Sequence, residues 1–138
     1  MRFRPLSHRR AASVVELALL LPFLVSLLLG MFEISRGILV KEAIINAANR
    51  AARTASIPGR NNSDVTPGVA EVLSAAGITG YTVTVRVNGA VADASTAVRG
   101  DRVSVQVSVP VARVYWLSGT YLPTTQTLSE TVTMMRQG

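Results

Sequence analysis

One carboxylate of this chain lies where a charge is costly. Glu16 is in the first turns of an apolar run in which no further residue is charged before Glu33. If that run enters a bilayer, a charged side chain costs about 2.5 kcal/mol or more at mid-depth and less near the interface. Two explanations follow from this cost. Either Glu16 lies shallow enough to reach headgroups or water, or a positive group pairs with it.

Other residue types that carry chemistry are few and dispersed. The chain has no Cys, which excludes disulfides, thiol catalysis and Cys-based zinc sites. The only histidine, His8, lies among arginines, where a solvated side chain is expected rather than a ligand or a general base. The acids after the N-terminal helix form no recognisable pair or cluster: Asp64, Glu71, Asp93, Asp101 and Glu130. We therefore expect no enzyme, no metal site and no cofactor.

The apolar run itself predicts a membrane span. Residues 14–32 form a mostly apolar run of about 19 residues, and at about 1.5 Å per residue a helix of this length matches a bilayer core of about 30 Å. A cleaved secretory signal would need a small-x-small site after the run, and residues 30–36 offer none. Pro22 lies inside the span and should kink or loosen the helix there, which membrane helices tolerate.

The net charge of +6 is better explained by topology than by nucleic acid. Four arginines precede the apolar run, at positions 2, 4, 9 and 10, and positive charge before a span is retained on the cytoplasmic side. The other basic residues are scattered, without the interleaved aromatics that single-strand binders use. We expect no nucleic-acid partner.

The helix should continue well beyond the span. No strong breaker occurs before Pro58-Gly59, so a helix over residues 12–56 is predicted, roughly 65 Å long. Beyond the span it carries an apolar stripe from Ile34 and Ile38 to Ala55. A second ladder of small residues, Ala47, Ala51 and Ala55, would permit close helix packing. This surface could cover the chain's own domain or contact a neighbouring subunit.

Residues 57–138 predict one small domain. A loop over 57–65 precedes a short helix over 67–76, and strict alternation then predicts strands over 81–87 and 102–109. A weaker strand over 90–97 follows the tight-turn pair Asn88-Gly89, and a last strand covers 125–134. The loop between the last two strands carries the aromatics Tyr115, Trp116 and Tyr121. They either cap the open end of the sheet or form a partner-contact patch. The predicted fold is α+β, with a long helix packed on one short helix and three or four antiparallel strands.

The N-terminal segment resembles the TadE-like pseudopilins of tight-adherence pilus systems. That family commonly reads Val-Glu-Phe-Ala-Leu, a couple of residues and then Pro, and here Val15 to Leu19 read Val-Glu-Leu-Ala-Leu, with Pro22 following. The resemblance implies that residues 1–11 are a basic leader. In prepilin-like proteins the peptidase leaves the glutamate at the fifth mature position, which puts the cut between Ala11 and Ala12. The usual residue before the cut is Gly, and this chain has Ala11, the next smallest.

The resemblance also implies a role and partners. The new ammonium of Ala12 would pair with Glu16 of the same or a neighbouring subunit. The chain would be a minor pseudopilin in the bacterial inner membrane, with its N-terminus cytoplasmic and its C-terminal domain extracytoplasmic. Its partners would be the bilayer, the prepilin peptidase, other pilins and the assembly platform. Two alternatives stay open: a membrane-anchored binding module, and a minor pseudopilin of a type II secretion system.

Overall fold

The computed structural model describes residues 7–115 and 125–137, with the backbone alone for residues 7–11. The chain falls into two compact units, residues 1–35 and residues 36–138. Helix α1 (Ser7–Ala55) provides the described part of the first unit and the first element of the second.

In the first unit, α1 is apolar and uncovered. Residues 12–32 are all exposed, and Ala12–Ala55 is a helix long and apolar enough to cross a membrane, judged by length and composition. Ser26 donates its hydroxyl hydrogen bond to the carbonyl of Pro22 at 2.8 Å, so this polar group is satisfied within the helix, as lipid requires.

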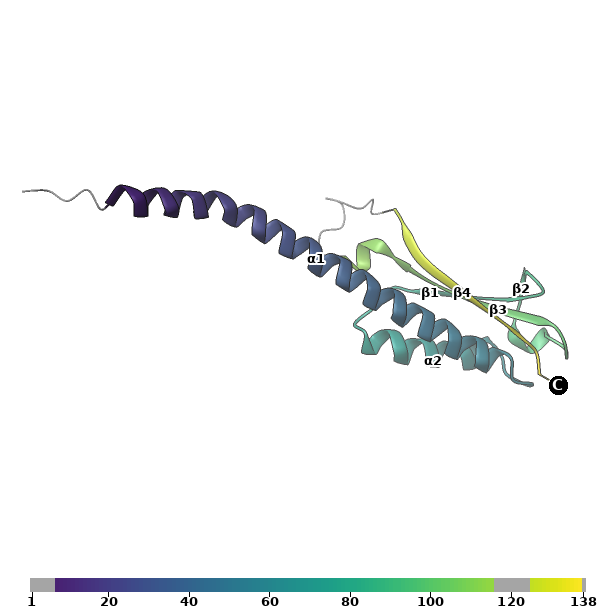
Figure 1. Ribbon diagram of the computed structural model, residues 1–138. Coiled ribbons are helices and arrows are strands. Elements are labelled where there is room, and N and C mark those ends of the chain that lie inside the picture. The colour runs from purple at the N-terminus through teal and green to yellow at the C-terminus, as the bar shows by residue number, and fades with distance from the viewer. Residues whose placement is uncertain (1–6, 116–124, 138) are drawn as a thin grey trace, which may run out of the picture. The chain divides into compact units, whose positions relative to one another are not determined.

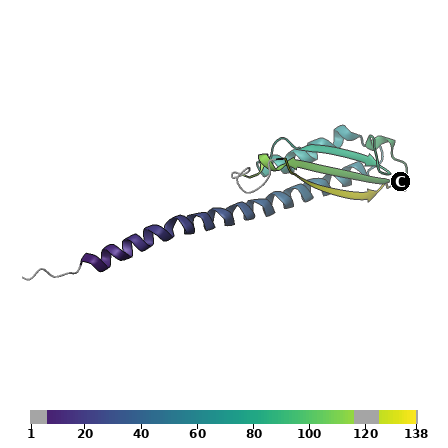
Figure 2. The same cartoon turned by 90° about the horizontal axis from the view of Figure 1, so that it is seen from above.

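The second unit contains an antiparallel four-stranded sheet of order β2-β1-β3-β4. Its strands are β1 (Thr82–Val87), β2 (Ala90–Val91), β3 (Arg102–Pro110) and β4 (Thr127–Met135). Central β3 pairs with β1 from Val87↔Val103 to Thr82↔Ser108, and with β4 along its whole length. Short 3-10 turns, η1 (Ala94–Thr96) and η2 (Val111–Arg113), precede and follow β3. Figure 2 shows the three long strands side by side.

Both helices cover one face of this sheet (Figure 1). Helix α2 (Asn62–Ala75) contributes Val65, Val69 and Leu73 to the core, each at most 1% exposed. The sheet contributes the alternate residues of β3, which are Val103, Val105, Val107 and Val109. Helix α1 contributes a mostly alanine face: Val40, Ile44, Ala47, Ala48, Ala51, Ala52 and Ala55.

The end of β4 is tied back to the end of α1. Arg136, only 6% exposed, donates from Nη1 to the carbonyl oxygen of Ala55 at 2.7 Å. The next backbone N–H, that of Gln137, donates to the carbonyl of Ser56 at 3.2 Å. Carbonyls at a helix C-terminus have no partner within the helix, so these bonds satisfy groups that the domain would otherwise leave unpaired.

Three boundaries differ from the sequence expectations. Helix α1 begins at Ser7, earlier than predicted. The Arg and Ala residues of this stretch have high helix propensity, and extending an existing helix costs less than starting one. Helix α2 begins at Asn62 rather than 67, because Asn61 and Asp64 form a capping box. The strand expected over 90–97 is reduced to Ala90–Val91, because the side chain of Asp93 caps the turn η1.

Two aspartates in the turns have lowered pKa values. The pKa of Asp93 lies below its model-compound value of 3.8, mainly because the backbone N–H of Ser95 donates to its carboxylate. The pKa of Asp101 is lowered mainly by the side-chain amide of Asn88, at 2.8 Å. Hydrogen bonds to a carboxylate favour its charged form.

These shifts predict an acid-dependent loss of stability. A depressed folded-state pKa stabilises the fold fully above the unfolded value, and this stabilisation is lost as the pH falls through the folded value. We therefore expect the thermal unfolding midpoint of the full chain in detergent to decrease when the pH is lowered below 3.8. The difference between wild type and Asp93→Asn should be larger at pH 7 than at pH 3. A difference of equal size at both pH values would contradict the assignment.

Candidate functional site

The predicted processing site lies inside α1. The backbone of Ala11 and Ala12 is helical, and Ala12 and Glu16 are exposed in the described part of the chain. Residues four apart lie on the same face of a helix, with about 5–6 Å between their Cβ atoms. A positive group at the nitrogen of Ala12 would therefore be within reach of the Glu16 carboxylate. Cleavage itself and the role of Glu16 stay predictions.

Pro22 does not end the helix. The helical assignment continues on both sides of it. Proline removes one backbone donor, so the carbonyl of Ala18 loses its partner four residues on. Pro22 is thus a local weak point in an otherwise regular segment, and its effect on helix direction stays a prediction.

The alanine ladder is used inside the domain. Ala47, Ala51 and Ala55 are at most 1% exposed and belong to the core cluster with α2 and the sheet. In the second unit they are therefore not accessible to a neighbouring subunit. The predicted apolar stripe is also displaced, because Ile34 and Ile38 are exposed by 68% and 55%. The buried face is instead set by small residues, which allow the backbone of α1 to approach its neighbours closely.

The aromatic residues of the last loop can be placed only in part. Tyr115 is half-buried and packs on the core, and its hydroxyl lies so close to Gly37 that a Cβ there would overlap it. Next to it, Nε of Arg36 donates to the carbonyl of Val114. Tyr115 thus packs against α1 rather than presenting a free aromatic ring. Trp116 and Tyr121 lie outside the described residues.

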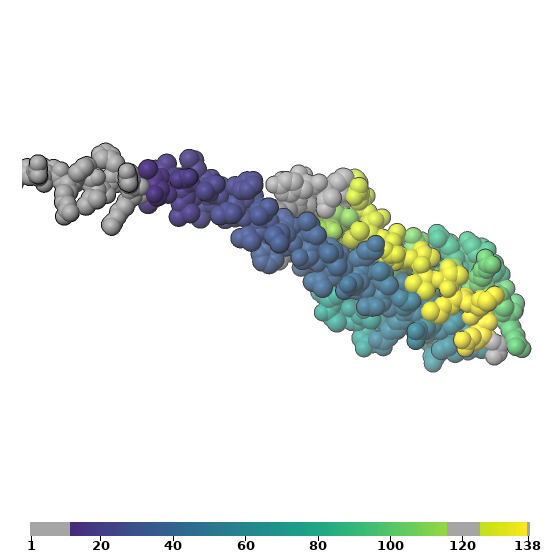
Figure 3. Space-filling model, viewed as in Figure 1, coloured from purple at the N-terminus to yellow at the C-terminus, as the bar shows by residue number. Residues whose placement is uncertain are grey.

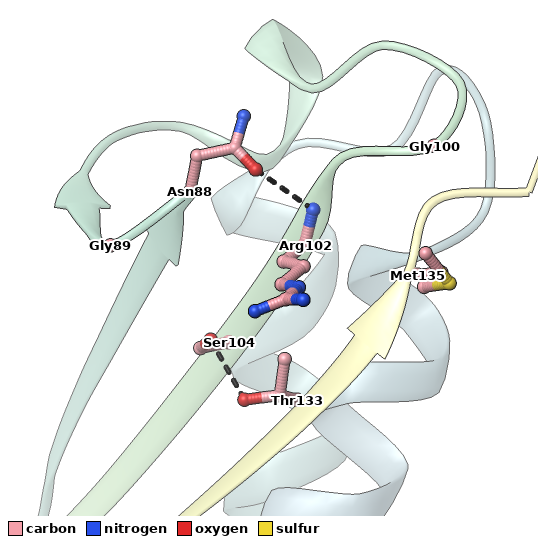
Figure 4. Close-up of a pocket in the computed structure, with 7 residues that line it drawn as sticks. All are labelled: Asn88, Gly89, Gly100, Arg102, Ser104, Thr133 and Met135. Carbon is pink, nitrogen blue, oxygen red and sulfur yellow. Dashed lines mark hydrogen bonds between the residues drawn. The ribbon is translucent and has the colours of Figure 1, made fainter.

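A hollow of about 670 Å³ lies on the face of the sheet that points away from the two helices, and it is lined by Asn88, Gly89, Gly100, Arg102, Ser104, Thr133 and Met135. It was not predicted from the sequence, although the sequence does indicate residues that line it: the Asn88-Gly89 turn and the polar alternate positions of β3. Figure 4 shows Arg102 between Asn88 of the β1–β2 turn and Thr133 of β4. Asn88 accepts from the backbone N–H of Arg102 at 3.0 Å, and the hydroxyls of Ser104 and Thr133 are 2.9 Å apart.

Neither the predicted processing site in α1 nor the hollow beside Arg102 contains a recognisable set of catalytic residues. Among the described residues, no group of three or more His, Asp or Glu side chains could hold a metal ion. The ion pairs Lys41–Glu130 at 3.7 Å and Arg50–Glu71 at 2.6 Å join elements of the domain. Exposed pairs of this kind contribute little to stability.

A comparison with family models decides the nature of the first region. The family described as TadE-like protein matches residues 11–53. This helix is TadE-like. This match implies a component associated with a Tad pilus. The match ends within α1 and leaves the sheet and α2 outside it. Neither the curated proteins nor the solved structures gave a match.

The internal use of the alanine face leads to a stability prediction. Ala51→Leu inserts three carbon atoms into a filled core, and overpacking of this kind costs about 1–3 kcal/mol. We expect the thermal midpoint of the full chain in detergent to fall clearly. Asn46→Leu, an exposed position on the same helix, is the matched control and should leave the midpoint nearly unchanged. An unchanged midpoint for Ala51→Leu would show that this face is not packed within the domain.

Proposed function

We propose that the chain is a minor pseudopilin of a tight-adherence pilus that acts in filament initiation or assembly through α1. The observation that supports this most directly is the TadE-like segment itself. It combines a basic leader, a lone carboxylate in the first turns and a long exposed apolar helix. An ordinary membrane anchor has no need of the carboxylate, which only adds to the cost of insertion.

The proposed topology follows from charge. The arginines of the leader stay in the cytoplasm and the domain of residues 57–138 is exported across the inner membrane. A prepilin peptidase then hydrolyses the peptide bond between Ala11 and Ala12. The leader is released, and Ala12 gains a free ammonium group. Two small side chains at this bond leave room for the peptidase to approach the backbone.

The new ammonium explains the position of Glu16. Within one chain it lies one helical turn from the carboxylate, and between chains it can meet the Glu16 of a neighbouring subunit. Either pairing offsets the desolvation of both charges in an apolar surrounding. Pairing between chains would also set the axial register of one α1 against the next. Because Ala47, Ala51 and Ala55 are occupied inside the domain, contacts between subunits would use the uncovered apolar part of α1 around residues 12–32.

Processing is tested by mass. The full chain, co-expressed with its cognate prepilin peptidase, should lose residues 1–11, and the same chain from a peptidase-null strain should keep them. A variant with Gly at the site, Ala11→Gly, should be cut at least as completely, since Gly is the usual residue there. An uncut chain in both strains would leave a plain signal anchor and remove the ammonium partner of Glu16.

Assembly is tested at Glu16. Glu16→Leu makes the helix more apolar, so insertion should persist while pilus formation is lost, because the ammonium of Ala12 then has no partner. Ser26→Leu replaces another polar residue of the same exposed segment and serves as the matched control; it should keep normal pili. Both are scored by membrane fractionation and by pilus counts in electron micrographs. Normal pili with Glu16→Leu would show that Glu16 is only an interfacial residue.

A further inference from the structure

The side of the sheet that faces away from the helices has an unusual composition. The register aligns its outward side chains in rows across the strands: Val91, Arg86, Ser104 and Thr133; Thr84, Gln106 and Thr131; Thr82, Ser108 and Ser129. Arg102 and Met135 form a further row. We call these residues the outer face. Their side chains are exposed or half-buried, whereas the alternate residues of β3 on the opposite face are fully buried.

The charge of the outer face has one sign. Arg86 and Arg102 are its ionisable residues, and no Asp or Glu is among the residues of this face. The carboxylate of β4, Glu130, is opposite Val107 on the inner face and pairs with Lys41. The nearest turn carboxylate, Asp101, accepts hydrogen bonds with both oxygens, from Asn88 and from the backbone N–H of Val98. Nothing on the face neutralises its two guanidinium groups.

The polar groups of the face are also rich in donors. Arg86 uses one of its five N–H groups to donate to Oε1 of Gln106 at 3.3 Å, which leaves the amide N–H groups of Gln106 and most of the guanidinium for a ligand. In the Ser104–Thr133 hydroxyl pair one hydrogen lies between the oxygens, so the second hydroxyl hydrogen can be donated outward.

The hollow at one end of this face has fixed walls. Asn88 has φ of 50° and Gly89 has φ of 89°, the left-handed conformations that a tight hairpin turn requires. The Asn88 side chain is held between Asp101 and the backbone of Arg102. Figure 4 shows the Arg102 guanidinium extending along β3 into this hollow, toward Ser104 and Thr133. A ligand that enters the hollow would meet a preorganised wall, which lowers the entropy cost of binding.

We propose that the outer face binds an acidic polysaccharide, with carboxylate groups on Arg102 and Arg86 and sugar hydroxyls on the Ser, Thr and Gln rows. Guanidinium groups bind carboxylates through paired, charge-assisted hydrogen bonds. Residues on one side of a strand repeat about every 7 Å, so the rows present a regular polar surface to a repeating polymer. This binding activity is separate from the pilus role and does not depend on cleavage of the leader.

Other ligand classes fit this surface less well. Single-stranded nucleic acids need aromatic side chains on which bases stack, and the described outer face has none. Tight protein partners need apolar or aromatic anchors at the centre of an interface, whereas here the exposed apolar residues Val91 and Met135 lie on the edge strands β2 and β4. Two arginines are too few for the phosphate contacts that dominate duplex DNA binding.

The test measures binding of the full chain in lipid nanodiscs to immobilised alginate, a polyuronate, at physiological ionic strength. Neutral dextran is the comparison polymer. We expect binding to alginate and little to dextran. Arg86→Gln combined with Arg102→Gln should weaken alginate binding by at least about tenfold, since charge-assisted hydrogen bonds are lost. A second variant, Thr131→Glu, keeps both arginines and should weaken binding by adding a carboxylate at the centre of the face.

The matched control removes the same charge elsewhere. Arg53→Gln combined with Arg60→Gln changes two exposed arginines outside the sheet and should leave alginate binding unchanged. An equal loss in this control would mean nonspecific attraction to a polyanion and would overturn the proposal. Equal binding to dextran, stronger binding to duplex DNA, or unaltered binding in both outer-face variants would overturn it as well. Circular dichroism melting curves confirm that each variant is folded.

Discussion

The domain of residues 36–138 depends on the close approach between α1 and the elements that it covers. Its contact face consists of alanines with Val40 and Ile44, and against it pack the valines of β3 and the three apolar residues of α2. Small side chains allow backbones to come near each other, and the large apolar area is then supplied mainly by the partners. Because such an interior is as dense as a crystal, it tolerates neither voids nor added volume. The sheet can therefore present its other face to solvent while its inner face is dry.

The two units of the chain use α1 in opposite ways. In residues 12–32 the helix carries mainly large apolar side chains, and every residue is exposed; Figure 3 shows one face of this segment. In residues 40–55 it carries mostly alanines on its contact face, and these are buried. Large apolar side chains are stabilised in a bilayer because their surface is transferred out of water. Alanines suit a packed core because they allow close approach. The TadE-like match covers residues of both parts of the helix and ends at residue 53, within α1.

Much of this arrangement could be predicted from the sequence. Alternating residues placed β1 and β3, the last predicted strand corresponds to β4, and the bounds of all three agree within two residues. The apolar run identified α1, because these patterns are local. The face of α1 that is buried could not be predicted from hydrophobicity, since Ile34 and Ile38 are more apolar than Ala47 and Ala51 but are exposed. The start of α2 is set by a side-chain cap formed by Asn61 and Asp64. The composition of this segment alone predicts a loop. The hollow beside Arg102 required the register between strands, which brings residues distant in the chain into one row.

The tie between the end of β4 and the end of α1 has a consequence for the order in which the chain acquires structure. Arg136 and Gln137 satisfy the carbonyls of Ala55 and Ser56, and β4 completes the sheet beside β3. During synthesis the helix is made first, and this strand is made only after β1 and β3. Until then the alanine face of α1 and the valines of β3 lack part of their cover. The domain can therefore close only after β4 has been made, and until then its exposed apolar surface is prone to aggregation.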